Sequence, residues 1–468
     1  MAKRVMSILA SVGLLVGMLA VGAGPAAAGA ASSADWNYRP MNVAIQVSPA
    51  QTTPNGIPLC TSGSLGNLVC YSPSFIKAAY NFPSSLDGTG QTIVIVDAYG
   101  SPTIASDLAR FDSLFGIAPP PSFTILCGNG GCPATPATAD KAHDPGGWAV
   151  ETSLDVEYAH AMAPGANIVL DVAASSSGNA INDAEATAIA LYPGAIFSQS
   201  FGIPEAYIKT GANNAQVKQA QKNYAAGIAK GDTFFASAGD SGADFGFGFA
   251  MANFPASDLH NTSVTGTQGN PYIEPGALTD CPTSITCSSG LATYQGPCAL
   301  GRTAPPPCVP VGYGGEQVWN EPLFGAATGG APSLLFGIPT YQSGLGLTAR
   351  GPDVSYNAAI DGGVLVVSGP YLYFVGGTSA GSPQWAGIAA LANQARASAS
   401  KGTIGDLNPV LYSIYHSAGY ASDFHDITVG NDQLVNSSVG FSASSGYDLA
   451  SGLGTPNVTN LVNDLATH

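Results

Sequence analysis

The stretch Thr92-Ile93-Val94-Ile95-Val96 decides the fold class, because a short apolar run predicts a strand that is buried on both faces. A helix should follow this strand, since apolar residues then recur at helical spacing, at Ile104, Leu108, Phe111 and Leu114. We therefore expect a buried strand at 92–96, followed by a helix that packs on it.

The same alternation continues along the chain. Further strands are predicted at 167–172, 195–200 and 233–236, and helices at 148–161, 181–191 and 215–230, the last ended by Gly231. Residues 268–350 interrupt this order with Pro, Gly and four cysteines, and we expect a surface excursion there. Alternating strands and helices predict an α/β fold with a doubly wound, mainly parallel sheet.

Composition limits the classes of function. The chain has 468 residues, of which 45% are hydrophobic and only 9% are charged, with a formal net charge of −16. Such a chain can fill a large core, and its acidic balance excludes the basic surface that nucleic-acid binding requires.

The first 31 residues predict a secretory signal peptide. Lys3 and Arg4 precede the apolar run 5–21, and small residues follow that run. No later segment is long and apolar enough to span a bilayer. We therefore expect a secreted, extracellular protein that has no membrane association once the signal peptide is removed.

Eight cysteines form four near-neighbour pairs, which favours disulfide bonds in an exported chain. Of the 105 possible connectivities, the four local ones are the simplest: Cys60 with Cys70, Cys127 with Cys132, Cys281 with Cys287, and Cys298 with Cys308.

Two short serine motifs suggest different hydrolases. Gly239-Asp240-Ser241-Gly242 is similar to the nucleophile loop of chymotrypsin-like proteases, but their paired antiparallel barrels contradict the predicted alternation. Gly377-Thr378-Ser379-Ala380-Gly381 matches the nucleophile elbow of α/β-hydrolases, with an expected strand at 372–375 and a helix at 379–397. Asp406 or Asp423 with His425 would complete its triad, so an elbow-type serine esterase is an alternative function.

A longer pattern, Gly377-Thr378-Ser379-Ala380-Gly381-Ser382-Pro383, resembles the serine signature that subtilisins and sedolisins share. The chain lacks the His-Gly-Thr-His run of subtilisins, so another group must activate the serine. Glu151 and Asp155 are one helical turn apart and therefore project from one helix face, beside an apolar stripe that predicts partial burial. These two carboxyl groups are the candidates for proton transfer.

Three motifs occur in the order of the sedolisin family, the secreted serine-carboxyl peptidases: Glu-x-x-x-Asp at 151–155, Ala-Gly-Asp-Ser-Gly at 238–242 and Gly-Thr-Ser at 377–379. Further matches lie at 198–205, 352–355 and 446–456. The resemblance covers about Tyr71 to the C-terminus, and it implies a subtilisin-like three-layer architecture.

The resemblance also implies a role for each site residue. Ser379 would be the nucleophile, Glu151 the general base and later acid, and Asp155 the group that orients Glu151. Asp240 would donate a hydrogen bond to the oxyanion, which requires it to be protonated and so favours acid pH. The substrate would lie along Ser200, Phe201 and Gly202 as an added strand.

A calcium site near the C-terminus follows from the same resemblance. Asp426 and Asp448 would supply carboxylate oxygens and Ile427, Ser444 and Gly446 main-chain oxygens, the hard donors that calcium prefers. We expect one structural Ca²⁺.

The lead-in before the catalytic domain is short for this family. Residues 1–31 are the predicted signal peptide, 32–70 a short lead-in and 71–468 the peptidase domain, whereas sedolisins are usually made with a prosegment of well over a hundred residues. The usual zymogen mechanism is therefore in question. Residues 30–70 would be vestigial, a separate chain would assist folding, or the protein would need no such help.

These observations predict a secreted, acid-acting peptidase, either an endopeptidase or a tripeptidyl-peptidase, that acts on polypeptides as a monomer. Besides the esterase, a second alternative to the peptidase is a non-catalytic secreted binding protein on the same scaffold. The scarcity of charge would then be an adaptation to acid, because few ion pairs exist to be lost when carboxylates protonate.

Overall fold

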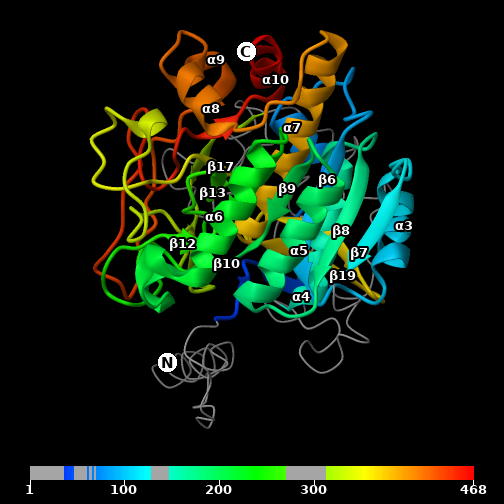
Figure 1. The fold of residues 1–468 in the computed structure, drawn as a ribbon. Helices are drawn as coiled ribbons and strands as arrows, with labels where there is room; N and C mark the ends of the chain where they lie inside the picture. The colour runs from blue at the N-terminus through cyan, green and yellow to red at the C-terminus, as the bar shows by residue number, and fades with distance from the viewer. Residues whose placement is uncertain (1–35, 47–60, 63–65, 68–69, 128–146, 270–312) are drawn as a thin grey trace, which may run out of the picture. The chain divides into compact units, whose positions relative to one another are not determined.

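A central sheet of eight strands organises the computed structural model, which describes residues 36–46, 61–62, 66–67, 70–127, 147–269 and 313–468. The strand order is β14-β13-β11-β9-β6-β8-β7, and β17 also pairs with β13 (Figure 1). These strands are β6 (Thr92–Ala98), β7 (Phe123–Cys127), β8 (Asn167–Ala173), β9 (Ile196–Gln199), β11 (Thr233–Ser237), β13 (Asn261–Gly269), β14 (Glu316–Val318) and β17 (Val354–Asn357). All neighbouring pairs are parallel except β13 with β14.

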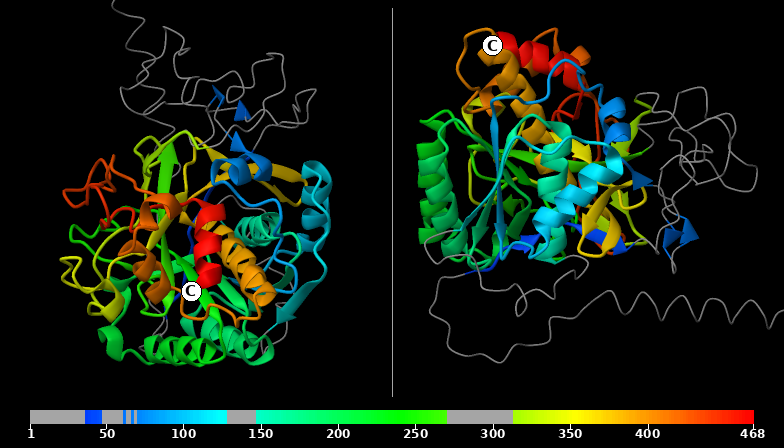
Figure 2. Two further views of the ribbon diagram at one scale, coloured as in Figure 1. Left: turned by 90° about the horizontal axis from the view of Figure 1, so that it is seen from above. Right: turned by 90° about the vertical axis from the view of Figure 1, so that its right-hand side faces the viewer.

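Helices cover both faces of this sheet (Figures 1 and 2). One apolar core joins the sheet to α3 (Ile104–Phe115), α4 (Trp148–Met162), α7 (Gly381–Ser398) and α10 (Val458–Thr467). A second core joins the other face to α5 (Gly178–Leu191) and α6 (Ala215–Ile228). The predicted doubly wound, mainly parallel α/β fold with three layers is confirmed.

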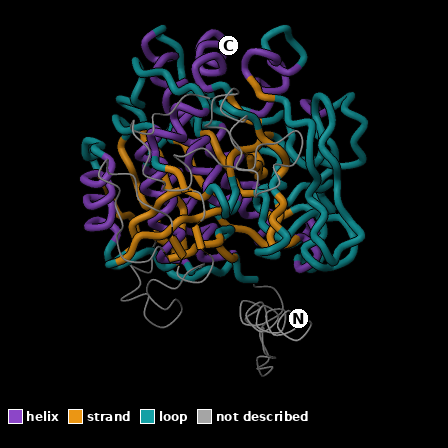
Figure 3. The backbone as a smooth tube through the Cα atoms, turned by 180° about the vertical axis from the view of Figure 1, so that it is seen from behind, coloured by secondary structure: helices purple, strands orange, loops and turns teal. Residues whose placement is uncertain are grey.

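Smaller elements surround these layers, and long loops gather beside the strands (Figure 3). Three strands form one small sheet in the order β1 (Arg39–Pro40), β10 (Phe201–Pro204), β12 (Asn253–Phe254), and four form another in the order β2 (Val43–Gln46), β19 (Tyr371–Gly376), β18 (Gly363–Ser368), β5 (Cys70–Tyr71). Three two-stranded pairs are β3 (Thr61–Ser62) with β4 (Gly66–Asn67), β15 (Asn320–Glu321) with β16 (Ala326–Ala327), and β20 (Phe424–His425) with β21 (Thr455–Pro456). Short helices are α2 (Pro73–Ala79), α8 (Asn408–Tyr415) and α9 (Tyr420–Asp423), and single 3-10 turns lie at η3 (Glu205–Tyr207), η4 (Gly211–Asn213), η6 (Thr340–Gln342) and η7 (Thr378–Ala380).

Two local expectations differ from the structure. Leu114 was expected on the buried face of its helix but is 39% exposed, because the apolar face continues through Phe115, four residues after Phe111. Residues 313–350 were expected in a surface excursion, whereas β14 joins the central sheet and Trp319 is fully buried. A three-residue strand is too short to be recognised from periodicity among Gly and Pro residues.

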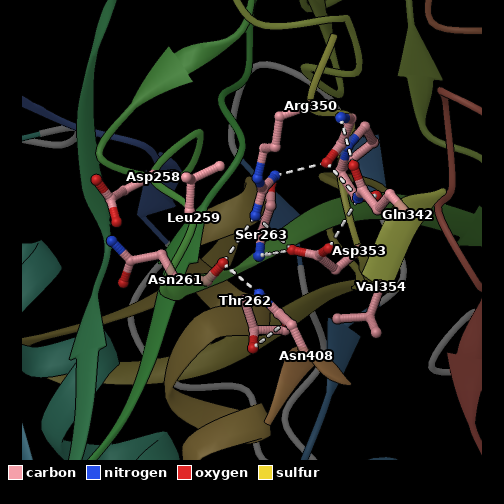
Figure 4. A network of polar contacts seen from close by, with 12 residues as sticks. Asp258, Leu259, Asn261, Thr262, Ser263, Gln342, Arg350, Asp353, Val354 and Asn408 are labelled. Atoms are coloured by element: carbon pink, nitrogen blue, oxygen red, sulfur yellow. Dashed lines mark hydrogen bonds and ion pairs between the residues drawn. The ribbon is translucent and has the colours of Figure 1, made fainter. Parts of the chain in front are cut away.

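A buried ion pair fixes the start of β17 against β13 (Figure 4). Arg350 Nη2 lies 2.5 Å from Asp353 Oδ2 and donates to the main-chain oxygen of Asn261 at 2.7 Å. Asp353 Oδ2 also accepts from the main-chain N–H of Ser263 at 2.8 Å. Because these charges are buried, the pair must keep its partners, and the match at 352–355 therefore has a structural role.

Candidate active site

Helix α4 places Glu151 and Asp155 inside the protein rather than at its edge. Every residue of this helix is buried, because α4 packs against the central sheet and is also in contact with α7, α3 and β18. The sequence predicted only partial burial of the two carboxyl groups, whereas both are fully buried in the structure. Full burial makes the charged forms of both groups costly.

A third acid, Asp97, joins this pair from the carboxyl end of β6. Burial raises the pKa of Glu151 well above its ordinary value, and the charge of Asp97 raises it further, while Asn42 and the nearby Ser379 hydroxyl act in the opposite sense. Burial likewise raises the pKa of Asp155, followed by the charges of Glu151 and Asp97. The three carboxyl groups therefore share protons as one cluster.

Sequence reasoning missed Asp97. The signal was present, because an acid that directly follows a buried parallel strand lies at the sheet edge where sites form. Burial raises its own pKa well above the usual range, and Thr152 lowers it by a hydrogen bond.

Ser379 lies in η7, the turn that leads into α7, and is fully buried. Its hydroxyl donates to the main-chain oxygen of Ser200 at 3.1 Å, and the Ser200 hydroxyl donates to the main-chain oxygen of Ser379 at 3.2 Å. Ser379 also acts on the pKa of Glu151, as noted above. The fold therefore brings Ser379 to the carboxyl cluster from more than two hundred residues away in the chain.

Asp240 follows β11 and faces the same turn. Its Oδ1 accepts from the main-chain N–H and from the hydroxyl of Thr378, each at 2.8 Å, while its buried Oδ2 has no partner among the described residues. Burial raises the pKa of Asp240 to about 7, against the lowering effect of the Thr378 bonds. Below that pH Asp240 is neutral and its free oxygen can carry a proton to donate.

The strand at Ser200, Phe201 and Gly202 is occupied by another part of the chain. Arg39 pairs with Gly202 and Pro40 with Phe201 in the antiparallel contact of β1 with β10. The predicted substrate strand is thus formed as part of β10, and the edge at which a substrate would add is paired with β1 in this structure.

The same N-terminal segment also contacts the predicted catalytic groups Glu151 and Ser379. The main-chain N–H of Met41 donates to Ser200 O at 3.2 Å, and the N–H of Ser379 donates to Met41 O at 2.9 Å. The side-chain amide of Asn42 donates to Glu151 Oε2. Sequence reasoning missed these contacts because more than one hundred residues separate the partners.

The residues of the alternative hydrolases do not assemble around a serine. His425 stacks on Tyr313 with ring centroids 3.6 Å apart, and Asp406 lies 4.0 Å from His260. In the part of the chain that the structure describes, no hydrogen bond or ion pair joins a histidine to Ser379. The predicted strand and helix on either side of Ser379 both form, as β19 and α7. However, β19 belongs to an antiparallel hairpin with β18, whereas the nucleophile elbow follows a strand of the main sheet.

Ser241 and Asp423 do not build a triad either. Ser241 is exposed and forms a bridge with Ala327, and Asp423 accepts from Ser422 at 3.2 Å. The chymotrypsin-like alternative also fails on the fold, which is a mainly parallel sheet.

The predicted calcium residues come together around one turn. Asp426 accepts from the main-chain N–H of Gly446 at 3.0 Å, and Asp448 accepts from that of Ser444 at 2.9 Å. Among the described residues, no main-chain N–H donates to the main-chain oxygen of Ile427, Ser444 or Gly446. Carboxylate and carbonyl oxygens are the donor type that calcium prefers. The described residues hold no group of three or more His, Cys, Asp or Glu side chains placed to bind a metal, so the calcium site stays a prediction.

Two predictions fall largely outside the described residues. The signal peptide at 1–31 does, as do six of the cysteines, while Cys70 and Cys127 each take part in a disulfide bond. The local pairing of the cysteines therefore stays a prediction.

The described part of the lead-in packs with the rest of the chain, because one compact unit runs from Trp36 to His468. None of the described helices is long and apolar enough to cross a membrane.

Comparison with solved structures defines the class of fold. The chain is similar to the Pseudomonas sedolisin (serine-carboxyl proteinase) in its complex with two molecules of pseudo-iodotyrostatin, with a TM-score of 0.64 and 23% identity. The match covers 86% of this chain and 100% of that chain. The protein therefore has the subtilisin-like α/β fold.

Sequence comparison defines the family. The chain is 30% identical to kumamolisin of Bacillus sp. (strain MN-32) over 400 residues, 25% to sedolisin of Pseudomonas sp. (strain 101) over 399, and 28% to human tripeptidyl-peptidase 1 over 428. The chain belongs to the sedolisin family.

These matches cover 82%, 84% and 86% of this chain but only 62%, 60% and 66% of the respective relatives. The chain thus spans about two thirds or less of their length. No protein-family model matches it.

Proposed function

We propose that this protein is a secreted serine-carboxyl peptidase that hydrolyses peptide bonds at acid pH through an acyl-enzyme on Ser379. The observation that carries the proposal is the meeting of Ser379, the Glu151 cluster and the unpartnered oxygen of Asp240 at one buried place. The names of the relatives, which are peptidases, support it. The proposal covers both internal cleavage and the removal of tripeptides.

In the first step, Ser379 Oγ attacks the carbonyl carbon of the substrate while Glu151 accepts the hydroxyl proton. A carboxylate serves as a base when its pKa is close to the working pH. Because burial and Asp97 raise the pKa of Glu151, its carboxyl group also holds the proton long enough to deliver it to the leaving amine. Asp155, one turn along α4, is the positioning partner of Glu151.

The oxyanion that forms in this step lies between two donors. One is the main-chain N–H of Ser379, which in the structure already donates to a carbonyl oxygen. The other is protonated Asp240, whose Oδ1 is fixed by Thr378 so that Oδ2 faces the site. Each such donor contributes about 10²–10³-fold to the rate.

In the second step, a water molecule attacks the acyl-enzyme while Glu151 takes its proton. The tetrahedral intermediate then collapses, and the proton returns from Glu151 to Ser379 Oγ. The substrate is held throughout as a strand beside Ser200, Phe201 and Gly202, which restricts its backbone to the orientation needed for attack.

We further propose one structural Ca²⁺ at Asp426, Ile427, Ser444, Gly446 and Asp448. Bound there, the ion would join the turn after β20 to the turn at 444–448 through oxygen ligands. Calcium titration of metal-stripped protein should raise its midpoint temperature of unfolding, and Asp448→Asn should remove most of that increase. An unchanged midpoint would contradict the site.

The enzymatic proposal is tested by peptide hydrolysis between pH 2 and 7. Wild type should show activity with an acid optimum, Ser379→Ala should have none, and Glu151→Gln should lose about 10²–10⁴-fold. Ser241→Ala is the matched control, because Ser241 belongs to the competing motif and is exposed; it should keep full activity. Activity that survives Ser379→Ala, or an optimum near pH 8 that is lost with His425→Ala, would contradict the proposal.

A further inference from the structure

Three aromatic side chains are exposed side by side next to β10 and β12. Tyr207 is 59% exposed, Phe247 36% and Phe249 48%. The ring centroids of Tyr207 and Phe247 lie 5.0 Å apart and those of Phe247 and Phe249 6.1 Å apart, both pairs in edge-to-face arrangements. Single exposed apolar residues are common, whereas a contiguous group of them marks an interaction site. We call these three residues the aromatic patch.

The loop that carries Phe247 and Phe249 is fixed from below by a buried acid. The side-chain oxygens of Asp244 accept from the main-chain N–H groups of Gly246 at 3.0 Å and of Gly248 at 3.2 Å. These glycines have φ values of +79° and +76°, which glycine adopts without strain. Because the loop conformation is already set, binding a partner to its two phenylalanines costs less conformational entropy.

The aromatic patch lies beyond one end of the strand on which a substrate would add. β1 pairs antiparallel with β10, with Arg39 opposite Gly202. A peptide on β10 therefore runs towards its own N-terminus as β10 runs towards η3, which holds Tyr207. On the other edge of β10, Asn253 of β12 is opposite Pro204, so the loop before β12 continues past the same end (Figure 1). The patch is thus where the N-terminal part of a bound peptide leaves β10.

Apolar residues continue from the groove towards the patch. The ring of Trp36, the first described residue of the lead-in, lies 6.4 Å from that of Phe254, which lies 6.4 Å from that of Phe336, centroid to centroid. Leu334, two residues before Phe336, is 53% exposed, and its main-chain N–H donates to the side chain of Glu205 in η3. The groove and the patch therefore belong to one apolar region.

The chain around the patch carries almost no charge. Residues 245–257 and 330–349 contain no Asp, Glu, Lys or Arg. Near Tyr207, Glu205 is buried and Lys209 is the next charged residue along the chain. Such a surface favours apolar side chains at any pH, because the hydrophobic effect does not depend on ionisation. The partner that fits it is an apolar stretch of polypeptide.

We propose that the aromatic patch is a second substrate-binding site, which holds an apolar stretch of polypeptide on the N-terminal side of the segment that lies along β10. In the structure Trp36–Met41 occupy the groove as far as Ser379, and a substrate that replaces them needs further residues before this length to reach the rings. The inference rests on the proposed function and narrows it to internal cleavage. A substrate that begins three residues before the cleaved bond could not reach the patch.

The experiment uses three fluorogenic peptides that share one cleavage site with six residues before it. The first has no extension, the second begins with an additional Phe-Leu-Phe-Gly, and the third begins with an additional Ser-Asn-Ser-Gly. At pH 4, wild type should have a KM about tenfold lower for the apolar extension than for the other two peptides, because only that extension places aromatic side chains on the patch. The value of kcat should be the same for all three.

Variants connect this difference to the patch. The double variant Phe247→Ala/Phe249→Ala should raise the KM of the apolar peptide to that of the unextended one. Leu191→Ala is the matched control, because Leu191 is also an exposed apolar residue, at 57%, and lies at the opposite end of α5 from Gly178, which contacts Trp36. This control should keep the tenfold difference.

Three results would overturn the second site while the peptidase stands. The first is an equal KM for the apolar and unextended peptides in wild type, or a difference that survives in the double variant. The second is a polar extension that lowers KM as much as the apolar one, which would show that length alone matters. The third is a dimer in sedimentation that becomes a monomer in the double variant, which would assign the patch to self-association.

Binding separates the failure of the proposed function from the failure of the patch. If wild type cuts none of the peptides while circular dichroism shows it folded, the proposed function fails. Fluorescence anisotropy of the same peptides with Ser379→Ala then tests the patch without cleavage. The apolar extension should tighten binding by about tenfold, and equal binding of the three peptides would overturn the second site as well.

Discussion

Asp240 is the residue whose protonation state sets the upper pH limit of the proposed reaction. Its Oδ1 is used by Thr378, and burial raises its pKa to about 7, so its Oδ2 can donate only below that pH. Above it, the site loses a donor and gains a negative charge beside the developing oxyanion.

Asp240→Asn should therefore move the alkaline limb of the kcat/KM profile to higher pH. The asparagine oxygen can keep both Thr378 bonds, and its amide donates at every pH. Asp240→Ala should instead lower kcat by about 10²–10³-fold across the range. The pH profiles of the three proteins provide the check, and an unchanged alkaline limb in Asp240→Asn would show that another group sets it.

Asp97 should set the opposite limb. Its charge raises the pKa of both Glu151 and Asp155, so Asp97→Asn should lower the pKa of Glu151 and shift the acid limb to lower pH. Asp232→Asn is a suitable control, because Asp232 is a buried acid that contacts Gly194 and Ala195 instead. If both variants shift the limb equally, the effect does not come from the cluster.

At the scale of elements, the crossing of α4 and α7 decides how deeply the carboxyl groups are buried. Gly387 of α7 faces Met162 of α4, and a Cβ on Gly387 would lie 2.5 Å from Met162 Cβ. Such a contact cannot be relieved by a side-chain rotation, because both atoms are fixed to the helix backbones.

Gly387→Ala should therefore destabilise the protein by about 1–3 kcal/mol of unfolding free energy. Helix propensity alone has the opposite sign, since alanine is favoured over glycine by about 1 kcal/mol within a helix. Urea unfolding of wild type, Gly387→Ala and the exposed control Ala397→Ser, expected within about 0.5 kcal/mol of wild type, distinguishes the two effects. A stabilised Gly387→Ala would show that the helices are not in close contact.

At the scale of the whole molecule, buried acids make stability depend on pH. Burial raises the pKa of Glu185 to about 8, of Asp171 and Asp240 to about 7, and of Asp232 to about 6. Unfolded, these groups have pKa values of about 4. The folded state thus binds their protons more tightly, and the stability they contribute is complete below about pH 4 and is lost as the pH rises to 8.

The urea midpoint of Ser379→Ala should accordingly be higher at pH 4 than at pH 7.5. His425 has the opposite effect on the pH dependence of stability, because burial lowers its pKa to about 4. It is a single group, whereas four buried acids favour the folded state at low pH. The inactive variant prevents self-digestion during the measurement. An equal or lower midpoint at pH 4 would contradict both this prediction and the interpretation of the low charge as an adaptation to acid.

The sequence by itself determined the α/β alternation and the order of Glu151, Asp155, Asp240 and Ser379. Periodicity and motif order are local properties of the chain, so they need no knowledge of packing. The strands at 92–96, 167–172 and 233–236 were predictable for this reason, and β14 was not, because a short edge strand depends on its partner.

Only the tertiary structure decided which groups share the site and how strongly they are perturbed. Asp97 joins Glu151 through the packing of α4 on β6, and the pKa shifts arise from full burial, which no local pattern encodes. The placement of Met41 and Asn42 across Ser379 depends on backbone pairing between segments far apart in the chain. No local pattern encodes such pairing, and so the contacts of Met41 and Asn42 with the site could be recognised only in the folded structure.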